Sequence, residues 1–276
     1  MARAAACSIS AAATASSCGF LEERPQWEAF GYEVSERYAG PNVSIGELPD
    51  EQFDLVTSFY VFEHVEDPVA TARELRRRLS DNGTLFLAVP DTLVNPIDVL
   101  AADHLSHFGL RSLRAMLDGA ELVLTAASRT SMAGTWLVAA RPPEAVTGGA
   151  DAVDGDDDVT ALGRYWAEAA SSLQRSAGAV DPRPASVAVY GAGVYGAYMK
   201  TRSGLPAGAV RCFIDRNARK HGTTFHGLPV HDLDGLGDVD TVLIGLRPDQ
   251  AEALAARPEL LDRRCIALPA WTGPSA

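Results

Sequence analysis

One stretch, Phe53 to Asp91, constrains the fold more than any other part of the chain. Phe53 to Ser58 is a short apolar run with β-branched members, which is typical of a buried strand. Apolar residues then recur at helical spacing, at Val69, Ala72, Leu75 and Leu79. Ser80 to Gly83 predicts the end of this helix, with Gly83 in the left-handed conformation. Thr84 to Val89 is a second apolar run, so the stretch predicts a βαβ unit with parallel strands and a right-handed crossover.

Composition narrows the class of protein. The chain has 276 residues, enough for one large or two ordinary domains, and 47% of them are hydrophobic. A net charge of −12 argues against an open nucleic-acid surface. The four cysteines are scattered, without a C-x-x-C pair, so neither a metal site nor a disulfide framework is predicted. No apolar run reaches membrane-spanning length, and we expect neither nucleic-acid nor membrane partners and a cytoplasmic location.

Several separated segments carry a family resemblance. FDLVTSFYVFEHVEDP, LFLAVPD and DHLSHFGLRSL follow one another in this order. Together they resemble the back half of a class I S-adenosylmethionine (SAM)-dependent methyltransferase, which implies an α/β fold with SAM as the cofactor. In that family the loop after the strand ending at Ser58 lines the methionine end of the cofactor. Four residues fall on that loop here, namely Phe59, Tyr60, Glu63 and His64. The alternative is that Phe59 and Tyr60 are core aromatics at a strand end.

Two acidic residues upstream match further cofactor contacts of the family. WEAFGYEVSERYA resembles its second strand, and Glu33 lies at the end of that strand, where an acid accepts hydrogen bonds from the ribose hydroxyls. Glu47 follows a short strand at Val43 to Ile45, near the point where an acid or amide meets the adenine. The alternative for Glu33 is a solvent-facing residue at a strand end.

Residues 1–18 do not fit the rest of the family pattern. The fold requires a strand and a glycine-rich turn there, yet residues 6–17 read ACSISAAATASS, without glycine or acid and with little strand character. Codons for these residues, read one base earlier, can encode V-L-D-I-G-C-G-D-G-F-F, the family's cofactor-binding strand and loop. We therefore hypothesise that this segment is a frame-shifted reading, against the alternative of an ordinary disordered N-terminus. As written, the segment is expected to bind SAM weakly or not at all.

A histidine near the middle of the chain is the candidate catalytic base. His104 follows Asp103, and an adjacent acid can orient a histidine ring for proton transfer. In sugar C-methyltransferases an E-H-L-S-Y-F segment carries the general base, and His104 and Asp103 match its histidine and acid. A tyrosine of that subfamily is replaced by Ala101, and an aromatic by His107, which leaves O-methylation open. The alternative is a histidine that caps or packs the start of a helix.

A second domain follows an acidic, glycine-rich linker at residues 147–158. A helix with one apolar stripe comes first, and Ser186 to Tyr190 then predicts a strand that runs into G-A-G-V-Y-G. Val210 to Ile214 is the next strand, and Asp215 ends it at the distance that dinucleotide folds require. This context predicts a Rossmann-like βαβ unit.

The second domain resembles the C-terminal domain of the same sugar C-methyltransferases, on the segments VAVYGAGVYGA and FIDRNARKHGTTFHGLPVHDL. There it helps to hold the nucleotide of the substrate. The residues implied in substrate binding are Gly191, Gly193, Gly196, Asp215, Arg216 and Lys220. The alternative is that the glycines serve only the turn and the helix packing. The family's N-terminal zinc domain, with its clustered cysteines, has no counterpart in this sequence.

The predicted fold class is therefore α/β: a truncated class I methyltransferase domain followed by a smaller Rossmann-like domain. The predicted parts are an aberrant, disordered N-terminus (1–18), a methyltransferase domain (19–146), an acidic linker (147–158) and a Rossmann-like domain with a leading helix (159–276). The leading hypothesis is a SAM-dependent methyltransferase acting on a small polar acceptor, with a nucleotide-linked sugar suggested by the resemblance. The alternatives are a catalytically impaired nucleotide- or sugar-binding protein and an NAD-dependent oxidoreductase using the second domain.

Overall fold

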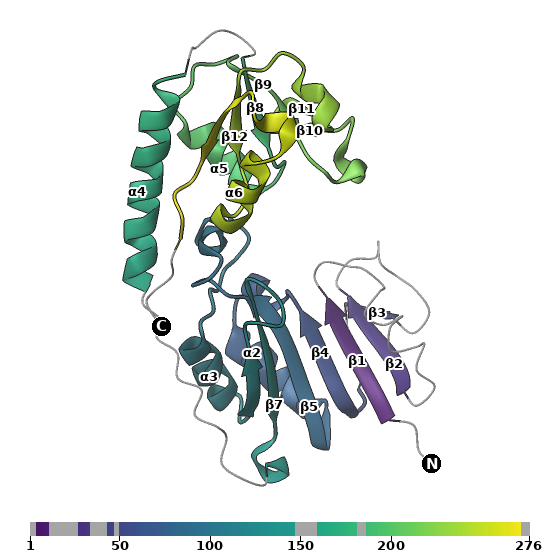
Figure 1. Cartoon of the computed structure of the whole chain (residues 1–276). Coiled ribbons are helices and arrows are strands. Elements are labelled where there is room, and N and C mark those ends of the chain that lie inside the picture. Colours follow the sequence, from purple (N-terminus) through teal and green to yellow (C-terminus); the bar gives the residue numbers. More distant parts are fainter. Residues whose placement is uncertain are drawn as a thin grey trace. The chain divides into compact units, whose positions relative to one another are not determined.

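The structure is a computed structural model that describes residues 4–10, 27–33, 43–46, 50–146, 159–180 and 186–271. The chain divides into two compact units, residues 1–157 and 158–276. Each unit has its own sheet with helices packed against it (Figure 1). The α/β fold class predicted from the sequence is confirmed. Among the helices of the described residues, none combines the length and the apolar character that a membrane crossing needs.

The first unit is built on a seven-stranded sheet of order β3-β2-β1-β4-β5-β7-β6. Its strands are β1 (Ala4–Ser10), β2 (Trp27–Glu33), β3 (Val43–Ile45), β4 (Phe53–Phe59), β5 (Leu79–Pro90), β6 (Val123–Ser128) and β7 (Thr135–Arg141). Its helices are η2 (Phe62–His64), α2 (Pro68–Arg77), η3 (Pro96–Leu100), α3 (Leu110–Gly119) and η4 (Pro143–Ala145). The first five strands are parallel, and β7 is antiparallel to both β5 and β6.

The segment from β4 to β5 forms the predicted βαβ unit, with the two strands parallel. Helix α2 begins where Asp67 Oδ1 accepts a hydrogen bond from the Ala70 amide, with Pro68 in its first turn. Its buried Ala72 and Leu75 belong to the core that β4, β5 and α3 share. The amphipathic pattern therefore placed the helix correctly, because only the apolar side had a sheet to pack against.

The end of α2 differs from the prediction. The helix ends at Arg77, and Leu79 is already the first residue of β5, where it pairs with Phe53. Gly83 lies within β5, and its φ is not positive. A Cβ on Gly83 would lie 2.8 Å from the carbonyl oxygen of Phe53. The glycine is thus required by the close approach of two strands, and the left-handed helix end was wrong.

Residues Ala4–Ser10 form β1, contrary to the expectation of a disordered segment with little strand character. The strand lies between β2 and β4 and pairs in parallel with both. Backbone hydrogen bonds on two sides outweigh the low strand propensity of alanine and serine, because propensity is a weak term beside tertiary pairing. Residues 11–18, which complete the predicted aberrant segment, lie outside the described residues.

The parallel strands of the first unit end at one edge of the sheet. Ser10 at the end of β1 is in register with Phe59 at the end of β4, and β2 ends at Glu33. Strand order reverses between β1 and β4, since β1 connects toward β2 on one side and β4 toward β5 on the other. Open α/β sheets bind ligands outside the carboxyl ends of their strands at such a switch point. Of the predicted cofactor residues, Glu33 ends β2 and Phe59 ends β4, so both lie at this edge of the sheet.

The second unit has a six-stranded sheet of order β10-β11-β9-β8-β12-β13. Its strands are β8 (Val187–Tyr190), β9 (Val210–Ile214), β10 (Thr224–Phe225), β11 (Leu228–His231), β12 (Thr241–Ile244) and β13 (Arg264–Ala267). Its helices are α4 (Val159–Ala177), α5 (Val194–Arg202), η5 (Ala218–Lys220), η6 (Leu233–Leu236), α6 (Pro248–Ala255) and η7 (Pro258–Leu260). Strands β8 and β12 are buried at every residue, as in parallel sheets covered on both faces. The β10–β11 hairpin was not predicted.

Candidate active site

The loop after β4 holds an unusual backbone conformation. Tyr60 has a φ of 55°, in the left-handed region that residues other than glycine seldom adopt. Its amide donates to the carbonyl of Ala88, and its hydroxyl lies 2.9 Å from Thr135 Oγ1. Phe59 is half-buried, with its ring 6.0 Å from that of Phe86. Strained residues of this kind concentrate at functional sites, so the conformation supports a role for this loop.

Glu63 is the buried acid of the site. It is 1% exposed, and its carbonyl oxygen accepts hydrogen bonds from the amides of Leu105 and Ser106 at 2.6 and 3.1 Å. These bonds tie the loop after β4 to the segment that carries His104. Within the described residues, Oε2 of Glu63 has no hydrogen-bond partner. Burial raises the pKa of Glu63, while His64 and His104 act in the opposite direction.

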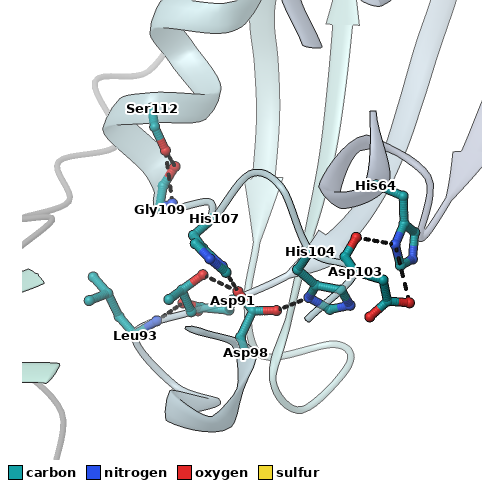
Figure 2. Close-up of polar contacts among 10 residues, drawn as sticks. His64, Asp91, Leu93, Asp98, Asp103, His104, His107, Gly109 and Ser112 are labelled. Carbon is teal, nitrogen blue, oxygen red and sulfur yellow. Dashed lines mark hydrogen bonds and ion pairs between the residues drawn. The ribbon is translucent and has the colours of Figure 1, made fainter. Parts of the chain in front are cut away.

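A second buried acid, Asp98, organises the histidines (Figure 2). One carboxylate oxygen accepts from His104 Nδ1 at 2.6 Å. The other accepts from His107 Nδ1 at 2.8 Å and from Thr92 Oγ1 at 2.6 Å. A carboxylate can only accept, so each of these hydrogen bonds places a proton on Nδ1, and a neutral ring then keeps its lone pair on Nε2. Asp98 lies at 2% exposure, and three donors satisfy it.

Asp98 corrects the prediction that Asp103 orients His104. The Asp103 side chain is 80% exposed and lies 3.7 Å from His64 Nδ1. The carbonyl oxygen of Asp103 accepts from the same nitrogen at 2.9 Å. Residues adjacent in the sequence turn apart in this loop, whereas η3 brings back an acid from six residues earlier. The signal that could have identified Asp98 is its place in a short segment between a strand end and two histidines.

The His64 and His104 rings meet edge to face, with their centroids 4.9 Å apart. The structure therefore joins four of the predicted residues, Glu63, His64, Asp103 and His104, in one cluster. Hydrogen bonds and ring contacts connect η2 with the segment after η3. The cluster lies next to Tyr60 in the sequence.

An ion pair that the sequence did not reveal lies at the end of β5. Asp91 is fully buried, and its Oδ2 accepts from Arg129 Nε at 2.9 Å. Its Oδ1 accepts from the Leu93 amide. Burial raises the pKa of Asp91 and the Arg129 guanidinium opposes that rise. The Arg129 guanidinium also lies 4.8 Å from the centre of the Trp136 ring.

The two acids predicted to contact the cofactor have different outcomes. Glu33 is buried at 5% exposure, so the alternative of a solvent-facing residue was wrong. Its carbonyl oxygen accepts from the Gly46 amide, which joins the ends of β2 and β3. Glu47 lies outside the described residues.

In the second unit, the glycines of G-A-G-V-Y-G have separate roles. Gly191 has φ of +100°, and a Cβ there would overlap the carbonyl oxygen of Gly245. A Cβ on Gly196 would overlap the carbonyl oxygen of Gly191. These two glycines are required by the tight turn and by close packing of α5. Gly193 is the N-cap of α5, and a Cβ there would meet no atom within 4 Å.

The acid at the end of β9 is bound to the same turn. Asp215 Oδ2 accepts from the Ala192 amide and from Lys220 Nζ, each at 2.9 Å, and Oδ1 accepts from the Asn217 amide. Lys220 Nζ also donates to the Ala192 carbonyl at 2.8 Å. Burial opposes ionisation of Asp215, but these donors together hold its pKa below the ordinary value. Arg216 is exposed. Asp215 and Lys220 thus both hydrogen-bond to the backbone of Ala192 and stabilise the glycine turn.

Comparison with known proteins identifies the first unit. Residues 9–127 match a family model described as a methyltransferase domain. This part of the chain is a methyltransferase domain. A search of curated proteins found no match.

Solved structures of methyltransferases resemble this methyltransferase domain at low identity. A SAM-dependent methyltransferase from Mesorhizobium loti is 16% identical, with 50% of this chain and 91% of that chain covered and a TM-score of 0.41. The methyltransferase CalO1 of calicheamicin biosynthesis, solved with S-adenosylhomocysteine, is 16% identical over 51% of this chain and 49% of its own, with a TM-score of 0.42.

The family match bears out the predicted class for this part of the chain: residues 9–127 are a methyltransferase domain, and SAM is the cofactor of that class. A small-molecule acceptor follows from the class. The matched residues include β2, β4, α2, β5 and the Asp98 cluster, and they end in β6. The acid at the end of β2, Glu33, is buried at the carboxyl edge of the sheet.

Proposed function

We propose that this methyltransferase acts on a small polar acceptor of the nucleotide-linked sugar class and that His104 is its general base. The observation that carries the proposal is the hydrogen bond between His104 Nδ1 and the buried Asp98 carboxylate. A carboxylate in this position fixes the ring, keeps the lone pair on Nε2 and stabilises the imidazolium that forms on proton uptake. The Asp98–His104 pair replaces the predicted Asp103–His104 pair.

The cofactor is assigned to the carboxyl edge of the first sheet. Glu33 would accept from its ribose hydroxyls, Glu47 would meet the adenine, and the loop of Phe59 and Tyr60 would border its methionine end together with Glu63 and His64. SAM supplies the methyl group as part of a sulfonium, which makes the sulfur a good leaving group. The support is that Glu33 ends β2 and Phe59 ends β4. Both residues therefore lie at the carboxyl edge of the sheet, on the two sides of the switch point between β1 and β4.

The proton step accounts for the role of the histidine. His104 Nε2 would take a proton either from an acceptor hydroxyl or from a carbon next to a keto group, so O- and C-methylation both remain within the proposal. The Asp98 carboxylate faces the positive ring that results. His104 is 18% exposed at its side chain, which leaves the ring accessible beside the buried Asp98. Positioning of acceptor and base supplies much of the acceleration in such a displacement.

The acceptor class rests on the second unit and on the resemblance to sugar C-methyltransferases. The open space at Gly193, on the N-terminus of α5, suits a diphosphate because the backbone amides are unobstructed there. Gly191 and Gly196 shape the turn, and Arg216 is the exposed cation that follows β9. The replacement of two subfamily aromatics by Ala101 and His107 is the reason to keep O-methylation in the proposal.

Residues 1–18 are proposed to come from a frame-shifted reading. Strand β1 occupies the place of the family's cofactor-binding strand, while residues 6–17 contain none of its glycines. Resequencing the gene tests the hypothesis directly. A frame that reads without interruption through Gly19 would exclude the shift.

We expect methyl transfer from labelled SAM to one or more nucleotide sugars, and a higher rate in a variant in which residues 6–16 read VLDIGCGDGFF. Glycines admit the cofactor to the backbone amides of the turn, whereas alanine and serine side chains obstruct it. The assay uses the unmodified chain and this variant side by side, with a panel that also contains free sugars and nucleotides. Transfer to no nucleotide sugar by either protein would contradict the acceptor class.

The alternative function is a binding protein without catalysis, and the absence of glycine in residues 6–17 favours it. Calorimetry separates the two, because heat from a nucleotide sugar without heat from SAM supports the alternative. We expect Gly193→Ala to fold normally and to weaken nucleotide-sugar binding about 10-fold, since its methyl group would occupy the space above the α5 amides. Unchanged affinity in Gly193→Ala would remove the diphosphate from this turn.

An NAD-dependent oxidoreductase is disfavoured by the second unit. The acid that would accept from a ribose in a dinucleotide fold is Asp215, and its two carboxylate oxygens are taken by Ala192, Asn217 and Lys220.

A further inference from the structure

Three side chains of the first unit form a cluster with the composition of a metal site. One ligand atom each from Glu63, His64 and His104 lies within 4.8 Å of the other two. Two imidazole nitrogens and one carboxylate oxygen are a donor set that borderline-soft divalent ions prefer. The sequence predicted no metal site, but that expectation rested on the spacing of the cysteines, which does not bear on this donor set.

The hydrogen bonds of the two histidines leave the same nitrogen free on both rings. His104 Nδ1 donates to Asp98 Oδ1, and His64 Nδ1 donates to the carbonyl oxygen of Asp103. Each acceptor fixes the tautomer, so Nε2 is the nitrogen that keeps a lone pair on a neutral ring. Metal-binding histidines are held in this way, with a carboxylate or a backbone carbonyl on the second ring nitrogen. The arrangement is that of two preorganised imidazole ligands.

Glu63 gives an independent reason for a ligand at this place. Its side chain is 1% exposed, and Oε2 has no hydrogen-bond partner among the described residues. A buried carboxylate oxygen without a partner is unfavourable by roughly 1–3 kcal/mol, because it has lost its hydration. A cation between Oε2 and the two rings would supply the missing partner.

We propose that Glu63, His64 and His104 bind one divalent transition-metal ion, with Zn²⁺ as the best-suited ion. Three protein ligands leave at least one position open, as in zinc sites that also bind a small molecule. Mg²⁺ and Ca²⁺ are disfavoured because they take oxygen ligands in place of imidazole. The remaining acids near the cluster are Asp98 and Asp103, which hold the rings from behind.

The metal-bound state and the base state of His104 exclude each other. A coordinated Nε2 has no lone pair for a proton, so an ion at this site would suppress proton uptake by His104. The metal site rests on geometry alone and stands whether or not His104 is the base. Binding of the ion is therefore measured without any methyl-transfer assay.

The test is calorimetric titration of Zn²⁺ into the full chain after chelator treatment and dialysis, with Co²⁺ absorbance as a spectroscopic readout. We expect one equivalent to bind, and Glu63→Gln and His64→Asn each to weaken the affinity about 100-fold or more. Asp98→Asn removes the carboxylate that orients His104 but no proposed ligand, and it should weaken the affinity about 10-fold. Circular dichroism tests whether each variant is folded. If His64→Asn does not fold, the affinity of Glu63→Gln for Zn²⁺ decides whether the proposal holds.

His107→Asn is the matched control, because His107 shares the Asp98 carboxylate but lies outside the cluster. Its Zn²⁺ affinity is expected to equal that of the unmodified chain within about threefold. No binding of Zn²⁺ by the folded chain would overturn the proposal. So would binding that is indifferent to Glu63→Gln, or Mg²⁺ binding in preference to Zn²⁺.

Discussion

Replacing Asp98 with asparagine is expected to lower the rate of methyl transfer by about 100-fold or more, since general base catalysis contributes about that much. The amide retains the volume of the carboxylate. It no longer carries the charge that fixes Nδ1–H on His104 and stabilises the imidazolium. The rate is measured with labelled SAM on whichever form of the chain is active. The same substitution is expected to have a small effect on SAM binding by calorimetry, because Asp98 makes its side-chain hydrogen bonds to Thr92, His104 and His107 and to none of the residues assigned to the cofactor.

Asp98→Ala extends this prediction to stability. We expect it to reduce the free energy of unfolding by about 2–4 kcal/mol, because three buried or half-buried donors on Thr92, His104 and His107 lose their acceptor. Thermal or urea unfolding of the full chain measures the loss. The expected change exceeds what a surface acid gives, which is within about 0.5 kcal/mol.

Asp103→Asn is the control for both measurements. Its side chain is 80% exposed, and the contact to His64 that matters comes from the backbone carbonyl. We expect nearly unchanged stability and a rate reduced less than about threefold. A large loss in Asp103→Asn together with a normal Asp98→Asn would restore the pairing that the sequence predicted.

Gly196→Ala is expected to destabilise the second unit by about 3 kcal/mol or more, because overpacking against backbone cannot be relieved by a side-chain rotation. The added methyl would overlap the carbonyl of Gly191, and a Cβ there would also lie 3.3 Å from the Phe213 ring. Hydrogen exchange resolves the effect by region. Amides of α5 and β12 should exchange faster, while those of β4 and β5 in the first unit should be unchanged.

Gly193→Ala serves as the matched control in the same turn. A Cβ at Gly193 meets no atom within 4 Å, and the residue has φ of −153°, which alanine adopts freely. The expected loss is within about 1 kcal/mol, the range for alanine at a helix N-cap. Equal stability of the two variants would mean that α5 does not pack against the turn as described.

The elements that could be predicted are those set by residues close together in the chain. The unit from β4 to β5 could be predicted because an apolar run, a 3.6-residue pattern and a second apolar run are each local signals. The same held for β8, whose apolar run precedes the glycines, and for β9, which ends at Asp215. The exact end of α2 could not be predicted, because Leu79 reads equally well as a helical residue and as a strand residue. Pairing with Phe53 decides in favour of the strand.

By itself the sequence determined the β4–α2–β5 unit and the strands β8 and β9, and its resemblance to a known family gave the methyltransferase class and singled out Glu63 and His104. The physical reason is that periodicity and motif spacing act between residues close in the chain. Only the tertiary structure made Ala4–Ser10 a strand, through pairing on both sides, and chose Asp98 over Asp103 as the partner of His104. Only it placed Asp215 and Lys220 on the glycine turn and left Glu63 buried beside two imidazoles. These features depend on the meeting of segments distant in the chain, and the free energy of those contacts does not appear in any single stretch of sequence.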